Sequence, residues 1–205
     1  DSYYPNLGLR FLSDLDLMVQ REDINRMDEI MHTLGYDHER SISLKRQLKL
    51  HHHLEAFYTQ HGIPVEVHYS VSRLNIPYNY SRVWSNSRLV SALPGNPVVP
   101  SPEDLLAHLA LNTSAHHPDR LLDLHLKFFA DLKFIMARCW DSFRWEYFFD
   151  AISSDGIEMA VLNPIFLARE LLEWDELGEV LERHGASVRY HEGFVRLLSR
   201  NIMEG

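Results

Sequence analysis

The sequence of 205 residues contains a single cysteine, Cys139. One thiol excludes an internal disulfide framework and a cysteine-rich zinc site. The chain also lacks any run of about 18 apolar residues, which is the length that a membrane-spanning helix requires. From these absences we expect a cytoplasmic protein without a membrane partner.

Positive charge is also scarce, because 20 lysine and arginine residues stand against 29 acidic residues, a net charge of −9. A negative net charge disfavours an extended nucleic-acid interface, although a local basic patch is compatible with it. Three common motifs are missing as well: a Gly-x-Ser-x-Gly nucleophile elbow, a Walker loop and a Rossmann fingerprint. None of these motifs therefore competes for the function of this chain.

Two acids interrupt an apolar segment near the start of the sequence, where Leu15, Leu17 and Val19 alternate with Asp14 and Asp16. Because side chains alternate between the faces of a strand, the pattern predicts a strand with both carboxylates on its polar face. Their Cα atoms would lie about 6.5–7 Å apart. Two like charges so close favour a divalent cation between them, and Mg²⁺ commonly binds one or two carboxylates together with substrate phosphates. The alternative is a strand end with two solvated acids.

A second alternating segment runs from Ile63 to Val71 and places Glu66 and His68 on its polar face. If the two strands are neighbours in one sheet and share their apolar face, Glu66 lies on the same side as Asp14 and Asp16. These three acids are therefore the candidate catalytic residues and metal ligands.

The first third of the chain has an α/β pattern. Residues 22–34 carry apolar side chains at helical spacing and are followed by Gly35, which predicts a helix. Residues 49–60 and 63–71 are both extended in character and are separated by a short turn, which predicts a β-hairpin. Prolines, which break helices and strands, become frequent between residues 77 and 100. We therefore expect a linker there, with a short helix at residues 80–84.

The spacing of apolar residues in the remainder of the chain predicts helices. Ser101 is a cap, and a proline and two acids follow it in the first helical turn. Further helices are expected at residues 120–136, 142–152, 156–162, 164–174 and 176–184, with an amphipathic segment near 192–202. The fold class is therefore α+β, with a small mixed β-sheet domain over residues 1–75, a linker over 76–100 and an α-helical domain over 101–205. Because the first residue is Asp, we expect the sheet domain to be truncated at its N-terminus.

Three separated blocks of the sequence resemble the motifs of one family. The first block is YPNLGLR with SDLDLMV (residues 4–10 and 13–19), the second is VEVHY (65–69), and the third is SPEDLLAHL (101–109) with His116 and Asp131 after it. In order and spacing they resemble a family of bacterial nucleotidyltransferases within the DNA polymerase β-like superfamily. The resemblance extends over residues 3–135.

The resemblance implies transfer of a nucleoside monophosphate with Mg²⁺ as the cofactor, Mn²⁺ being the alternative. It implies that Asp14 and Asp16 bind Mg²⁺ at the triphosphate, while Glu66 completes a second metal site and helps to deprotonate the acceptor. Two ions about 3.5–4 Å apart stabilise both the attacking and the leaving oxygen of an in-line displacement. The expected partners are an NTP and an acceptor, a small molecule or a protein, that the sequence does not identify.

Five further residues are candidates for binding the nucleotide or the substrate. They are Arg10, Ser13, His68, His116 and Lys127. A guanidinium offers phosphate two parallel donors, and an imidazole two residues from Glu66 can contact a metal-bound carboxylate. Each role has an ordinary alternative: a surface ion pair for arginine, core packing or helix capping for the histidines, and ion pairs along a helix face for lysine.

The glycine-containing phosphate-binding turn that this superfamily has upstream of the Asp-x-Asp strand is not visible in the sequence. A catalytically silent binding or regulatory module of the same fold, and a metal-dependent phosphohydrolase, are therefore alternatives to the transferase. A zinc site formed by His51 and His53 with His61 or His68 is another alternative, although no cysteine supports it.

Overall fold

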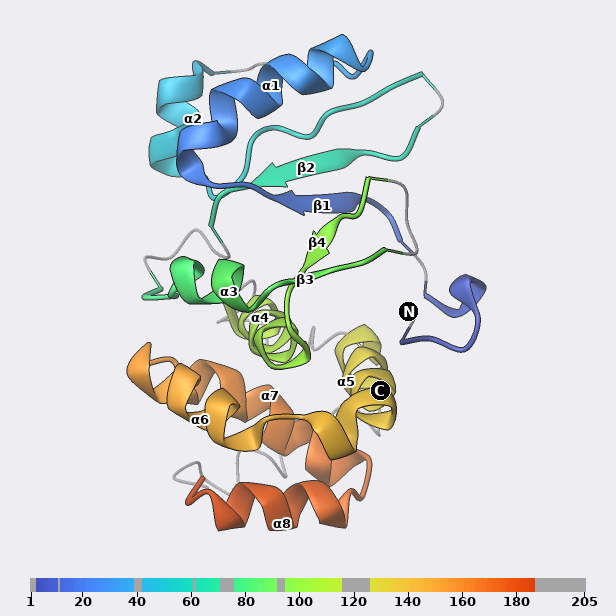
Figure 1. Cartoon of the computed structure of the whole chain (residues 1–205), viewed down its shortest axis with the longest axis vertical. Coiled ribbons are helices and arrows are strands. Elements are labelled where there is room, and N and C mark those ends of the chain that lie inside the picture. Colours follow the sequence, from blue (N-terminus) through green and yellow to red (C-terminus); the bar gives the residue numbers. More distant parts are fainter. Residues whose placement is uncertain are drawn as a thin grey trace, which may run out of the picture. The chain divides into compact units, whose positions relative to one another are not determined.

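The computed structural model describes residues 3–10, 12–38, 42–60, 62–70, 76–91, 95–115 and 126–186. The chain divides into two compact units, one formed by Tyr4–Asn75 and the other by Ile76–Gly205 together with Asp1–Tyr3. Strands and helices share the first unit, whereas the second is mainly helical (Figure 1). The predicted α+β class is thus confirmed. The amphipathic segment expected near residues 192–202 lies outside the described residues.

The first unit is built on two parallel strands, β1 (Leu15–Met18) and β2 (Val65–His68). A parallel pair needs a long crossover connection, and here it contains the helices α1 (Ile24–Thr33) and α2 (Leu44–Leu50). Short 3-10 turns, η1 (Leu7–Leu9) and η2 (Arg21–Asp23), precede β1 and α1. The helix predicted at residues 22–34 is therefore confirmed, and Gly35 follows it with a φ of 83°.

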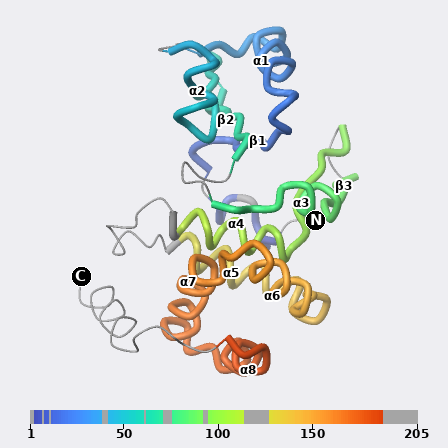
Figure 2. Tube along the Cα trace, turned by 90° about the vertical axis from the view of Figure 1, so that its left-hand side faces the viewer, coloured from blue at the N-terminus to red at the C-terminus, as the bar shows by residue number. Residues whose placement is uncertain are grey.

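Figure 2 shows helices α1 and α2 beside the strand pair. The core of the first unit contains side chains from both helices and from both strands. Val65 and Val67 of β2 are buried there, and Leu17 and Val19 pack against the same cluster. The alternation of side chains then leaves the neighbouring positions of both strands on the opposite face. The sequence also predicted Leu15 and Ile63 on the apolar face, but both are more than 40% exposed because they lie at the outer ends of the strands.

The prediction of a regular hairpin at residues 49–60 and 63–71 is wrong for its first strand. Residues 49 and 50 end helix α2, and the backbone of residues 51–60 pairs with β2 at isolated antiparallel bridges, His53 with His68 and Phe57 with Val65. Leu54 and Phe57 are both fully buried although they are three residues apart. A regular strand repeats every two residues, so the chain needs an irregular path to bury both side chains.

The second unit begins with residues that were expected to form a linker. These residues contain helix α3 (Tyr80–Asn86) and an antiparallel pair, β3 (Arg88–Leu89) and β4 (Val98–Val99). The short helix predicted at residues 80–84 is confirmed. Arg82 of α3 donates two hydrogen bonds, of 2.9 and 2.8 Å, to the carboxylate of Asp155. This paired contact fixes α3 to the helices that follow.

Helix packing forms the rest of the second unit. Ser101 accepts a hydrogen bond from the backbone N–H of Asp104, as the predicted cap requires, and α4 packs against three of the later helices. The helices, with the 3-10 turn η4, are α4 (Pro102–Ala115), α5 (Leu126–Cys139), η4 (Trp140–Ser142), α6 (Trp145–Ser154), α7 (Glu158–Leu171) and α8 (Asp175–Arg183). None of the helices in the described part of the chain has the length and the apolar character needed to cross a membrane.

Helix α7 corrects one prediction. The sequence suggested two helices separated before Pro164, but one helix continues through this proline. Proline in a helix interior costs about 3 kcal/mol. Val161, Ile165 and Ala168 are buried at helical spacing around it, so tertiary packing offsets that cost.

Candidate active site

Two of the three predicted acids lie side by side on neighbouring strands. Asp16 of β1 is the register partner of Glu66 of β2. Register partners of adjacent strands point to the same face, and adjacent strands are about 4.8 Å apart. The parallel register thus places these two carboxylates together on the face opposite the core.

The imidazole of His68 contacts both carboxylates. Its Nε2 lies 3.2 Å from Oδ1 of Asp16 and 3.3 Å from Oε2 of Glu66. The side chain of Asp16 is 63% exposed, whereas those of Glu66 and His68 are 28% and 15% exposed. The group is therefore open to solvent on the side of β1.

The surroundings of His68 have opposing effects on its pKa. Burial disfavours the charged imidazolium, but hydrogen bonding and charge interactions with Asp16 and Glu66 outweigh burial, so the pKa of His68 is raised. When His68 is protonated, its positive charge balances part of the charge of the two acids.

His53 extends this group from the irregular segment beside β2. Its backbone forms an antiparallel bridge with His68, and the two imidazole rings are 5.0 Å apart. Nδ1 of His53 lies 3.9 Å from Oε2 of Glu66 and 2.6 Å from the backbone oxygen of Leu54. Of the alternative zinc ligands, His53 and His68 are therefore neighbours, whereas His61 lies outside the described residues.

Asp14 lies one residue before β1 and is half-buried. One of its carboxylate oxygens accepts a hydrogen bond of 2.9 Å from the hydroxyl of Ser13. At this site, the ligand atoms that lie within 4.8 Å of one another belong to Asp16, Glu66 and His68, and Asp14 is not among them. The role of Asp14 as a third metal ligand, and that of Ser13 in substrate binding, stay predictions.

The other candidate residues lie outside this group. Arg10 is half-buried in the segment before β1, and Lys127 is exposed on α5 in the second unit. His116 lies outside the described residues. Their proposed contacts with the nucleotide stay predictions.

The donor set of the group fits a divalent cation. Two carboxylates and one imidazole offer ligand atoms within 4.8 Å of one another. Mg²⁺ usually takes only one or two carboxylates from the protein and completes its shell with water and substrate phosphates, so an open, partly exposed pair of acids is suited to it.

A comparison with protein families decides the class of the protein. The model of a family described as "Uncharacterised nucleotidyltransferase" matches residues 1–173. The chain belongs to this nucleotidyltransferase family. The match includes both strands with Asp16 and Glu66, and it continues through α7. No curated protein and no solved structure matches the chain significantly.

The raised pKa of His68 gives this nucleotidyltransferase a pH dependence that can be measured without a substrate. By NMR in the absence of metal, we expect the imidazole of His68 to titrate above its ordinary value of 6.5. We expect Asp16→Asn to lower that pKa, because it removes a negative charge that favours the imidazolium. The stability contributed by the ion pairs is fully present below the pKa of unfolded histidine and is lost as the pH rises through the raised folded value.

The signal of His68 is assigned by its disappearance in His68→Gln. A pKa at or below the ordinary value in the metal-free protein contradicts the geometry described above, and so does a pKa that Asp16→Asn leaves unchanged.

Proposed function

We propose that this protein is a Mg²⁺-dependent enzyme that transfers a nucleoside monophosphate from an NTP to a small-molecule or protein acceptor. Membership of the nucleotidyltransferase family supports the transferase class. The observation that carries the proposal is the pairing of Asp16 with Glu66 in adjacent strands, on the face opposite the core. We assign the metal ligands as Asp14, Asp16 and Glu66, with Mn²⁺ as a substitute for Mg²⁺.

The reaction that we propose is an in-line displacement at the α-phosphorus of the NTP. A hydroxyl oxygen of the acceptor forms a bond to this phosphorus while the bond to the bridging oxygen breaks, and pyrophosphate leaves. Glu66, the more buried of the two paired acids, takes the proton of the acceptor. Two bound divalent ions would stabilise the charge on the attacking and leaving oxygens.

His68 has a positioning role in this proposal. Its contacts with Asp16 and Glu66 hold both carboxylates at one place before the cation arrives. A bound cation would oppose the protonation of His68, whose neutral imidazole could still orient one of the two carboxylates. Arg10, Ser13, His116 and Lys127 are assigned to the phosphates or the acceptor.

The proposal is tested by incubating the protein with each of the four NTPs, labelled at either the α- or the γ-phosphate, and Mg²⁺. Fractions of small molecules and of proteins are added as acceptors. We expect the α label to move to an acceptor with release of pyrophosphate, and chelation of the metal to stop the reaction. Release of inorganic phosphate would indicate the phosphohydrolase instead, and nucleotide binding without turnover would indicate a silent binding module.

A further inference from the structure

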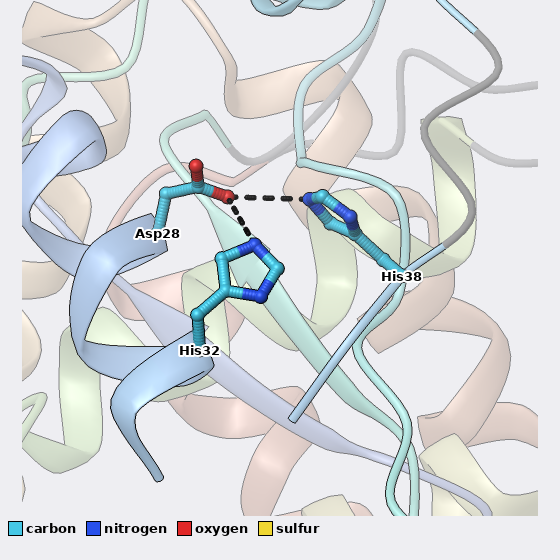
Figure 3. A group of neighbouring side chains, drawn as sticks. All are labelled: Asp28, His32 and His38. Atoms are coloured by element: carbon cyan, nitrogen blue, oxygen red, sulfur yellow. Dashed lines mark hydrogen bonds and ion pairs between the residues drawn. The ribbon is translucent and has the colours of Figure 1, made fainter. Parts of the chain in front are cut away.

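A second group of potential metal ligands lies in the first unit, separate from Asp16 and Glu66. Asp28 and His32 are four residues apart on α1, so they share one face of the helix. His38 follows after the chain reverses at Gly35. Figure 3 shows the three side chains pointing toward one another, with one oxygen of Asp28 facing both imidazoles.

The distances from Asp28 to the two imidazoles are close to those between ligands of one metal ion. Oδ1 of Asp28 lies 3.2 Å from Nε2 of His38 and 3.8 Å from Nε2 of His32, and all three ligand atoms are within 4.8 Å of one another. Zinc bonds of about 2.0–2.1 Å in a tetrahedron put neighbouring ligand atoms about 3.4 Å apart. The two distances from Oδ1 of Asp28 lie on either side of this spacing.

Each imidazole has another side chain beside it. The ring of His38, whose side chain is 3% exposed, lies 4.4 Å from the ring of the buried Phe57. Oδ1 of Asp37 lies 3.6 Å from Nδ1 of His32, the nitrogen that faces away from Asp28. A carboxylate behind a histidine ligand is a common second layer of zinc sites, where it fixes the ring and raises its basicity.

The backbone also supports this arrangement. Residue 37 exchanges two backbone hydrogen bonds with Tyr58, of 2.9 and 2.7 Å, and the carboxylate of Asp37 accepts another from the N–H of His38. The segment that carries His38 is therefore fixed against the chain beside β2, and Asp28 and His32 are fixed on a helix. The ligand atoms do not depend on a free loop for their positions.

From this geometry we propose that Asp28, His32 and His38 form a zinc site with one coordination position open to solvent. Two imidazoles and one carboxylate favour zinc over magnesium, which prefers oxygen ligands. The side chain of His32 is 41% exposed, which gives the ion access to the group. The bound ion would link the C-terminal half of α1 to the segment at residues 37–38.

The test is equilibrium dialysis of the whole protein against Zn²⁺, with excess Mg²⁺ to occupy the carboxylates of Asp16 and Glu66. We expect His32→Gln/His38→Gln to bind one zinc equivalent fewer than the wild type. Asp37→Asn is expected to weaken the binding of the same zinc ion by about 10- to 100-fold, because it removes the charge beside His32 but no ligand. The double variant His108→Gln/His184→Gln, with both positions in the second unit, controls for the loss of two histidines and is expected to keep the wild-type number of equivalents.

Circular dichroism shows whether each variant is folded, and the exposed single substitution His32→Gln replaces the double variant if that one is not. The proposal is overturned if the wild type binds no zinc, or if removing the histidines leaves zinc binding unchanged. Because the readout is metal binding, this result is independent of whether nucleotidyl transfer is observed.

Discussion

Asp16→Asn is expected to lower the rate of nucleotidyl transfer by about 10²- to 10³-fold, because it weakens the binding of the proposed metal ion that would stabilise the developing charge. The substitution keeps the shape of the side chain but removes one of the two neighbouring negative charges of the register partners Asp16 and Glu66. The fold should tolerate it, because the side chain of Asp16 is 63% exposed. The measurement is the initial rate of α-label transfer at saturating NTP and Mg²⁺.

Glu22→Gln is the matched control for this experiment. Glu22 is an exposed acid of η2 in the same unit, so its neutralisation changes the net charge equally without touching the site. We expect this control to keep the wild-type rate. Full activity in Asp16→Asn, or an equal loss in both variants, would remove Asp16 from the catalytic group.

Phe148→Ala is expected to reduce the free energy of unfolding of the second unit by about 3–5 kcal/mol. Phe148 on α6 is 1% exposed and contacts the rings of Phe143 and Trp145, with centroid distances of 5.6 and 6.3 Å. Truncation therefore removes a large buried area and leaves a cavity within an aromatic cluster that cannot collapse easily.

Tryptophan fluorescence during urea unfolding measures this effect on one unit alone. The four tryptophans of the chain, at positions 84, 140, 145 and 174, all belong to the second unit. Met159→Ala on α7, where the side chain is 61% exposed, serves as the control and should change the stability by less than about 0.5 kcal/mol. A loss below about 1 kcal/mol for Phe148→Ala would mean that this aromatic cluster is not a tightly packed core.

Much of the first unit could be predicted from local patterns. The alternation around Asp16 and Glu66 gave both strands and the face on which the acids lie, because a period of two is a property of the strand itself. The helix α1 and the cap at Ser101 followed from spacing and capping residues in the same way.

The failures of sequence reasoning involve packing between distant segments. Helix α7 continues through Pro164 because buried neighbours offset the lost hydrogen bond, and the segment before β2 is irregular because Leu54 and Phe57 must both reach the core. The Asp28–His32 pair has the i, i+4 spacing of a metal motif, but a single histidine after an acid gives a weak signal until His38 is seen beside it.

The sequence by itself determined the family, the strands that carry the acids and the side of each strand on which the acids stand. Only the tertiary structure decided that Asp16 pairs with Glu66, that His68 lies between them, and that His38 returns to the face of α1. The physical reason is the sequence distance over which the interactions act. The period of a strand or helix is set by a few neighbouring residues. Strand register and the contacts of side chains from distant segments depend instead on how the whole core packs.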